Sequence, residues 1–206
     1  MHISDGIIST PVCLTATAAA IGLVYLTGRR ATTEEIPRMG ITGAALFVAS
    51  LIHFPVAGTS IHLGLFGIAG IILGRRSFPV VFTALLFQAL IFQHGGLLTL
   101  GVNAINMGTG AFMAWIIWRI TAIPEYARAA LAGFTGIIVP ALLMIAEFRI
   151  TGYGSAVAVI ALIYIIAALI EGGITLSAVV FFRKVKPDIL ANPVLNCKHE
   201  KVYGDD

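Results

Sequence analysis

Histidines are the residues of this 206-residue chain that are best suited to chemistry, because they supply nitrogen atoms to an otherwise apolar sequence. Imidazole nitrogen is a good ligand for borderline transition metals such as nickel, copper and zinc. Polar side chains stranded within membrane-spanning sequence mark function by default. The spans assigned below place four histidines in the outer half of one helix bundle, beside the leading amine: His2, His53, His62 and His94.

The opening dipeptide, Met1-His2, is a chelating unit. Its α-amine, the His2 backbone nitrogen and the His2 imidazole Nδ1 would close a five-membered and then a six-membered ring on one ion, with little loop-closure cost. One further nitrogen would complete a planar set, which favours Ni(II) or Cu(II) and is compatible with Co(II). An ordinary α-amine, with a pKa of about 7.7–8.0, must lose its proton to bind, so binding is expected to release protons and weaken in acid. The alternative is an N-terminal residue without a role.

His62 is our choice for the fourth nitrogen, because it follows the turn-rich stretch PVAGTS at the predicted outer mouth. A structural histidine bonded to neighbouring backbone is the alternative. Ser60 would hold the His62 turn, with packing or capping as an equal alternative. Asn103 and Asn106 are three residues apart and share a helical face, so they would orient the metal-binding histidines or link helices by hydrogen bonds.

Composition places the chain in a bilayer. Hydrophobic residues make up 58% of it and charged residues only 11%, whereas soluble domains carry roughly 25% charged residues. We expect an all-α polytopic membrane bundle, because a spanning helix needs about 20 apolar residues. Seven apolar stretches predict seven transmembrane helices, at roughly 8–27, 39–56, 60–74, 78–94, 97–118, 128–148 and 155–182.

Basic residues orient this predicted bundle. With the N-terminus outside, only Arg149 of the thirteen Lys and Arg residues falls on the outer side. The positive-inside rule therefore predicts an outside N-terminus and a cytoplasmic C-terminus, as an odd number of spans requires. We expect one domain, 1–206, with a membrane core at 1–186 and a polar cytoplasmic tail at 187–206. The basic residues on the predicted inner side are Arg29, Arg30, Arg38, Arg75, Arg76, Arg119, Arg128, Arg183, Lys184, Lys186, Lys198 and Lys201.

Several functions lack their sequence signatures. No G-x-x-x-x-G-K-[ST] loop and no H-E-x-x-H motif occur, so we expect no nucleotide bound by this chain and no zincin-type protease. No basic stripe indicates nucleic-acid binding. The segment before the small-residue stretch TATAAAIG has no Lys or Arg, contains Asp5 and is interrupted by Pro11, so we do not expect cleavage as a signal peptide.

Four stretches resemble a known family in order along the chain. MHISDGIIS resembles an M-H-I-P-D-G start, PVAGTSIHLG resembles P-V-x-G-T-S-x-H-L, and FQHGGLLTLGVNAINMG resembles F-Q-D-G-G-L-x-x-L-G-x-N-x-x-N-M-G. EGGITLSAVVFF is similar to a weaker E-x-x-I-T stretch. These motifs are those of the CbiM/NikM family, the substrate-capture subunits of nickel and cobalt energy-coupling-factor transporters.

The resemblance implies seven helices, with the N-terminal residues tucked into the bundle. It implies that the transported Ni(II) or Co(II) is held by the Met1 amine, the His2 backbone nitrogen and side chain, and His62. It also implies partners: a transmembrane coupling protein and a cytoplasmic ABC-type ATPase, with a small accessory membrane subunit as a further candidate. Two positions depart from the motifs. Ser4 replaces a frequent Pro, and His94 stands where Asp is usual, as a fifth ligand, an access-route residue or a helix cap.

We therefore expect a metal-uptake subunit of the prokaryotic cell membrane and not an enzyme. The first alternative is a gradient-driven divalent metal carrier, with Glu147 and Glu171 as proton relays. Glu171 has a structural reading as well, as a pairing partner for another helix or as part of a partner surface. The second alternative, a metal-dependent membrane enzyme, would need a nearby general acid or base, and the outer half offers few carboxylates beyond Asp5.

Overall fold

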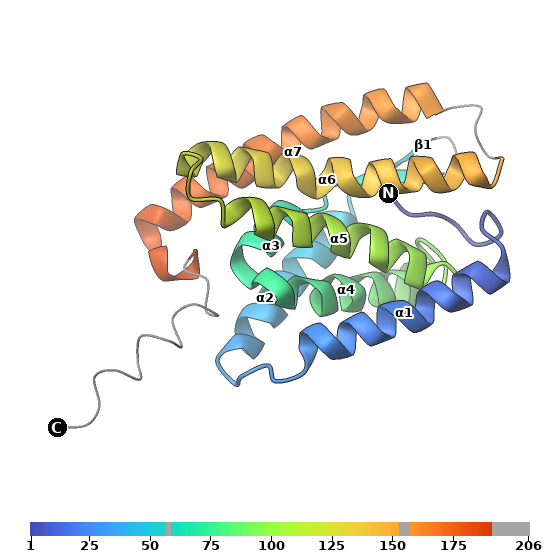
Figure 1. Cartoon of the computed structure of the whole chain (residues 1–206), viewed down its shortest axis with the longest axis horizontal. Helices are drawn as coiled ribbons and strands as arrows, with labels where there is room; N and C mark the ends of the chain where they lie inside the picture. Colours follow the sequence, from blue (N-terminus) through green and yellow to red (C-terminus); the bar gives the residue numbers. More distant parts are fainter. Residues whose placement is uncertain (57–58, 153–156, 191–206) are drawn as a thin grey trace.

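The computed structural model describes residues 1–56, 59–152 and 157–190 of the chain. Within them the chain forms an elongated helix bundle with a short two-stranded hairpin, and an extended N-terminal segment runs back into the bundle (Figure 1). The elements in order are α1 (Thr10–Gly28), α2 (Glu35–Ser50), β1 (His53–Val56), β2 (Thr59–His62), α3 (Phe66–Leu73), η1 (Gly74–Arg76), α4 (Ser77–Phe92), α5 (Leu100–Trp118), α6 (Glu125–Ile150), α7 (Val157–Val185) and η2 (Pro187–Ile189).

The hairpin is the main departure from the predicted helices. Residues 39–56 and 60–74 were expected to be continuous spans, but α2 ends at Ser50 and α3 has only eight residues. Between them β1 pairs with β2 in antiparallel fashion, and His53 lies opposite His62. Pro55 explains part of the difference, because proline removes a helix donor. Strand pairing then satisfies the backbone groups that a helix would have satisfied.

Five segments are long and apolar enough to cross a bilayer, by length and composition alone, among the described residues. One of them, Phe66–Phe92, joins α3, η1 and α4. It is interrupted at Gly74, whose φ of +56° is a left-handed conformation, and by two arginines of η1. The protein is thus an all-α membrane bundle apart from its hairpin. The other four segments are Thr10–Gly28, Leu100–Trp118, Glu125–Ile150 and Ala158–Val185.

Close backbone approach holds the centre of the bundle together. A Cβ atom on Gly67 of α3 would lie 2.5 Å from the Cα of Gly133 in α6, and one on Gly133 would lie 2.5 Å from the Glu171 carbonyl oxygen in α7. A Cβ on Gly70 would overlap the Ala111 carbonyl oxygen of α5. Small residues of this kind let membrane helices pack backbone to backbone. We call Gly67, Gly70, Gly110, Gly133 and Gly136 the glycine seam.

A buried arginine organises one end of the bundle. Arg76 is 3% exposed, and its guanidinium donates to the carbonyl oxygens of Thr27 (2.6 Å), Arg29 (2.8 Å) and Arg30 (2.6 Å) and to the Glu35 carboxylate. These bonds pin the α1–α2 connection to η1. At the same end, Arg128 of α6 donates to the Trp118 carbonyl of α5.

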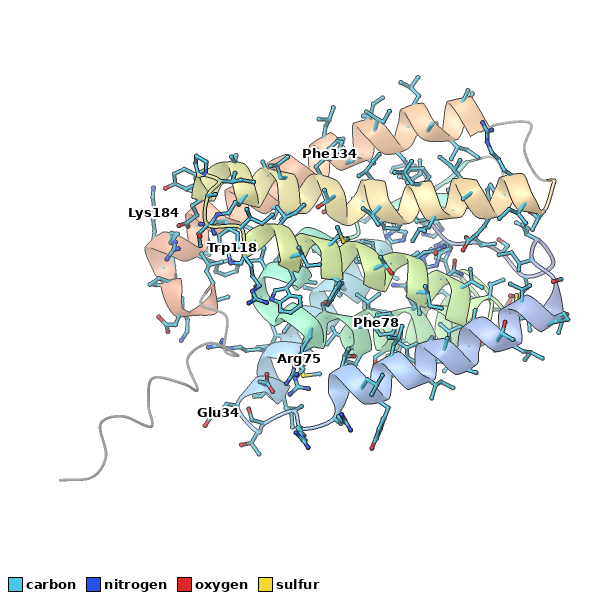
Figure 2. The ribbon with its side chains drawn as sticks, viewed as in Figure 1. Glu34, Arg75, Phe78, Trp118, Phe134 and Lys184 are labelled. Carbon is cyan, nitrogen blue, oxygen red and sulfur yellow. The ribbon has the colours of Figure 1, made fainter. Side chains whose placement is uncertain are left out.

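Figure 2 shows Arg75 and Lys184 toward this end as well. Arg75, Arg76, Arg128 and Lys184 thus lie toward one end of the bundle. Part of the segment expected to be polar tail folds back here, since Leu190 is buried against Trp118 and Val179. Residues 191–206 lie outside the described part of the chain.

Candidate metal site

The N-terminal segment is buried although it belongs to no helix or strand. Met1 is 1% exposed, His2 3% and Ile3 0%. Ser9 and Pro11 explain why the chain turns before α1, since Ser9 has extended dihedral angles and proline fits the first turn of a helix. Residues 1–5 therefore run back into the bundle, where they contact α5 and the α4–α5 connection.

Asn103 of α5 holds this segment by its backbone. Its side-chain oxygen accepts the Ile3 N–H (2.8 Å), and its side-chain nitrogen donates to the Ile3 carbonyl (3.0 Å) and to the Gly95 carbonyl (3.1 Å). The Thr99 hydroxyl also contacts the Ile3 carbonyl (2.8 Å) and the Gly95 carbonyl. One amide thus fixes the residue that follows His2. Thr99, one turn before Asn103, has no place in the sequence prediction, although its spacing on the same helix face was a usable signal.

Asp5 provides a second anchor. Its carboxylate accepts the Thr99 N–H (2.9 Å) and contacts the Thr99 hydroxyl (3.0 Å), directly before α5 begins at Leu100. A carboxylate at a helix N-terminus is favoured by the unpaired N–H groups and the helix dipole. Gly96 makes the contact possible, because it has φ +77° and a Cβ atom there would overlap the Asp5 carboxylate.

Four imidazoles meet beside the N-terminal segment. The ring centroids of His2 and His62 are 4.9 Å apart, those of His2 and His94 4.3 Å, and those of His53 and His94 4.3 Å. We call these four residues the histidine cluster. The structure therefore brings together residues that are up to 92 positions apart in the sequence (His94 minus His2). The Nδ1 edge of His2 faces Gly95, where a Cβ would come within 2.5 Å of that nitrogen.

The tautomer of His62 follows from its neighbour. Its Nδ1 lies 3.1 Å from the Leu63 carbonyl oxygen, which can only accept, so Nδ1 carries the proton. Nε2 then carries a lone pair, and it is buried with no hydrogen-bond partner in the described structure. A ring whose N–H is held by a carbonyl while its other nitrogen is open is the usual arrangement of a metal-binding histidine. A cavity of about 10 Å³ adjoins the ring, and Ser50 and Gln88 also line it.

Burial keeps these nitrogen atoms neutral. Desolvation lowers the pKa of the Met1 amine to about 4, and it lowers the pKa of His62 to about 3, with the nearby amine as a lesser cause. Burial, then the charge on His53, lowers the pKa of His94 to about 4. The amine and both imidazoles therefore offer lone pairs at neutral pH. The sequence-based expectation of an ordinary amine pKa does not hold in this structure, because the amine is desolvated.

Glu171 fixes the backbone beside His62. Its Oε1 accepts the N–H groups of Gly64 and Leu65 (2.9 Å to the latter), which come just before α3. The carboxylate is 1% exposed and reaches from α7 to α3. Glu171 is thus a link between helices, the first of its two structural readings.

The other predicted residues divide between roles. Asn106 donates to the Glu147 carboxylate of α6 at 2.8 Å, which is the helix-linking alternative. His94 lies between His2 and His53, as an access-route residue would. The side chain of Ser60 lies outside the described residues. Among the described residues, no three His, Cys, Asp or Glu side chains form a group able to hold a metal ion. An ion bound here by His2 and His62 would therefore need donors other than a third His, Cys, Asp or Glu side chain of the described residues.

A family profile described as "Cobalt uptake substrate-specific transmembrane region" matches residues 2–189. The chain belongs to the CbiM family. The CbiM family is a family of membrane transport proteins and not of enzymes. A CbiM relative, the "Cobalt transport protein CbiM" of Sorangium cellulosum, is 32% identical over 213 residues, which cover 92% of this chain and 94% of that protein.

Other relatives match over part of their length. A protein of Haemophilus influenzae is 39% identical over 127 residues, and the match spans 62% of each chain. The "Fused nickel transport protein NikMN" of Rhodobacter capsulatus is 31% identical over 164 residues, 73% of this chain and 47% of that protein. A crystal structure of a transition metal transporter superposes with a TM-score of 0.81 at 25% identity, covering 99% of this chain and 100% of the other. The fold of this CbiM chain is therefore that of a solved metal transporter.

Proposed function

We propose that this CbiM chain captures Ni(II) or Co(II) as the substrate-binding transmembrane subunit of an ATP-driven uptake system. One observation carries the proposal: the leading amine and His2 are buried against His62, whose Nε2 is buried and open. The donor set is the Met1 amine, the His2 backbone nitrogen, the His2 Nδ1 and one His62 nitrogen, for which Nε2 is available. Four nitrogens favour a tetragonal ion such as Ni(II).

Asn103 would position these donors without binding the ion itself. Its bonds to both backbone groups of Ile3 fix the backbone of the residue that follows the dipeptide, and thereby the direction of Met1 and His2. Glu171 acts in the same way on the other partner, because it holds the backbone at residues 64 and 65. Residues that orient metal ligands typically change affinity 10–100-fold when mutated. Ser60 and His94 remain candidates for support and access.

Seven membrane crossings are proposed, with the N-terminus outside and the C-terminus in the cytoplasm. The third crossing is discontinuous: the hairpin end and residues 63–65 lead into the eight-residue α3. Irregular backbone at membrane depth is tolerated where it is buried in protein. The whole chain, 1–206, is proposed to be one domain. The basic residues at the end of the bundle that holds Arg76 and Arg128 support the proposed orientation.

The energy source is proposed to lie in partner subunits. This chain carries no P-loop motif, and the fused nickel transport protein of Rhodobacter capsulatus supports association with other transporter subunits. We infer a transmembrane coupling protein and a cytoplasmic ABC-type ATPase, with a small accessory membrane subunit as a further partner. Metal uptake in cells with and without that ATPase tests this step, and uptake that persists without it would indicate a gradient-driven carrier.

Direct metal binding tests the site. The purified full chain is titrated with Ni(II) and with Co(II), beside a His62→Ala variant and a His199→Ala control in the polar tail. His62→Ala should abolish tight binding while helix content and thermal unfolding stay unchanged, and His199→Ala should bind normally. A planar, diamagnetic nickel centre is the expected spectroscopic state. Normal affinity in His62→Ala would contradict the ligand set.

A further inference from the structure

His53 and His94 remain unused by the proposed metal site, although they touch it. Their ring centroids are 4.3 Å apart with planes tilted by 46°, and the His94 ring is equally close to His2. His53, His94 and His2 thus form a row of three rings. Exposure falls along it, because His53 is exposed, His94 is partly buried and His2 is buried. The row therefore leads from the surface of the bundle to the buried donors.

The tautomer of His53 leaves a nitrogen for an ion. Its Nδ1 lies 3.1 Å from the Leu51 carbonyl oxygen, so this nitrogen donates and Nε2 carries the lone pair. The same arrangement occurs at His62, where Leu63 provides the carbonyl. Two histidines of the cluster, His53 and His62, are thus each oriented by the carbonyl of a nearby residue.

The local field also favours a cation at this place. Helices α2 and α4 end at Ser50 and Phe92, just before His53 and His94. The two helix ends lie together, since the Gln88 amide donates to the Ser50 hydroxyl at 2.6 Å. The C-terminal end of a helix carries partial negative charge, so two such ends side by side stabilise a positive ion.

We propose that His53 and His94 form an outer loading site, which binds Ni(II) or Co(II) from solution and passes the ion to the buried nitrogens. The inference rests on the proposed function, because it needs a buried site to receive the ion. Two imidazoles leave the remaining coordination positions to water, so binding is weaker and exchange faster than at the four-nitrogen site. Such a pair agrees with the absence of a three-side-chain metal group among the described residues. His94 contacts both His53 and His2, so it is the residue that transfers the ion.

Two changes to the full chain separate the sites in an Ni(II) titration. The first is the double variant His53→Ala/His94→Gln, which removes the outer pair. The second is a short extension ahead of Met1, which displaces the amine and leaves the outer pair in place. The unmodified chain should bind one tight and one weaker equivalent. The double variant should keep the tight equivalent, lose the weaker one, and load roughly tenfold more slowly in stopped-flow, within the range that local ion enrichment provides.

The outcomes distinguish the two proposals. The extended chain should lose the tight equivalent and keep the weaker one. If the extended chain keeps tight binding, the proposed function fails. If the double variant keeps both equivalents and the normal loading rate, or if the extended chain binds no ion at all, the loading site is refuted. His53→Ala alone, at an exposed position, repeats the test with little risk to folding, and His199→Ala shows the contribution of the tail.

Discussion

The glycine seam and the N-terminal segment are both buried, but different forces hold them. The helices of the seam meet backbone to backbone at glycines such as Gly67 and Gly133. The N-terminal segment is extended and is held by hydrogen bonds. Ile3 bonds to Asn103 and Thr99, and Asp5 bonds to Thr99. Packed backbone has no room to move, whereas a few hydrogen bonds can be exchanged. The proposed donors of Met1 and His2 thus lie on a segment held by hydrogen bonds and not by backbone packing.

Breaking the seam should have the largest effect. In Gly70→Ala the new methyl group would overlap the Ala111 carbonyl oxygen and lie within 3.0 Å of the Trp115 backbone nitrogen. Backbone cannot yield as a side chain does, so the free energy of unfolding should fall by at least about 1–3 kcal/mol. Thermal unfolding of the purified chain measures this. Gly173→Ala in α7 faces open space and should be neutral or slightly stabilising. Equal melting temperatures for the two variants would contradict the packing account.

Removing the Asn103 side chain, which holds the N-terminal segment, should lower metal affinity more than stability. Asn103→Ala frees both backbone groups of Ile3, so Ni(II) affinity should fall about 10–100-fold with a small change in melting temperature. Asn106→Ala is the matched control on the same helix, because it loses only the Glu147 bond. It should cost stability by about 0.6 kcal/mol and leave affinity unchanged. Equal affinity losses in the two variants would refute the distinction.

A smaller effect on metal affinity is expected at Gly96, which lies against the Asp5 carboxylate. Gly96→Ala puts a methyl group into the Asp5 carboxylate and a side chain at φ +77°. Detaching Asp5 should lower Ni(II) affinity by roughly tenfold, equivalent to about 1.4 kcal/mol. Gly152→Ala is the control, since its φ is +76° but its Cβ would meet no atom within 4 Å. Both variants carry the backbone strain, so a similar affinity loss in Gly152→Ala would show that strain alone is responsible.

A further prediction concerns protons. With a pKa of about 4, the Met1 amine of the folded chain is already neutral at pH 7 and releases no proton on binding. Only the His2 backbone N–H must ionise, so log affinity should rise with pH by about one unit per pH unit between pH 5 and 7.5. An exposed amine would add a second proton to this slope. Titrations across that pH range decide the matter, and a slope near two would show that the amine is not buried.

The same shift affects stability. The unfolded amine takes up a proton below about pH 8, whereas the folded one does so only near pH 4. The unfolded state therefore binds more protons between these values, and the metal-free fold should lose stability as the pH falls from 8 toward 4. Thermal unfolding of the metal-free chain at several pH values should show this trend.

Much of the fold could be predicted from sequence, because apolar length and basic residues report on helices and their ends. The hairpin could not. Residues 53–62 lie where two stretches predicted as spans, 39–56 and 60–74, come together, and a short apolar run does not separate a buried strand from a helix. The start of the short α3 depends on tertiary contacts, since Glu171 accepts the N–H groups of Gly64 and Leu65 from 107 and 106 positions away.

The candidate site shows a similar division. Chelate geometry identified Met1 and His2, and motif resemblance supported His62. The closeness of His53 to His94 was not predicted as a contact, because it depends on strand pairing and on where α2 and α4 end. The contact between Asp5 and Thr99 was not predicted either, since the two residues are 94 positions apart.

The central claim is that the amine of Met1 itself binds the ion. The most direct measurement uses a full chain with a short N-terminal extension that a protease removes to leave Met1 first. Before cleavage, Ni(II) titration should show no tight equivalent, although the melting temperature of the metal-free chain is unchanged. After cleavage, the tight equivalent should return in the same sample. Tight Ni(II) binding of equal strength before and after cleavage would contradict the account.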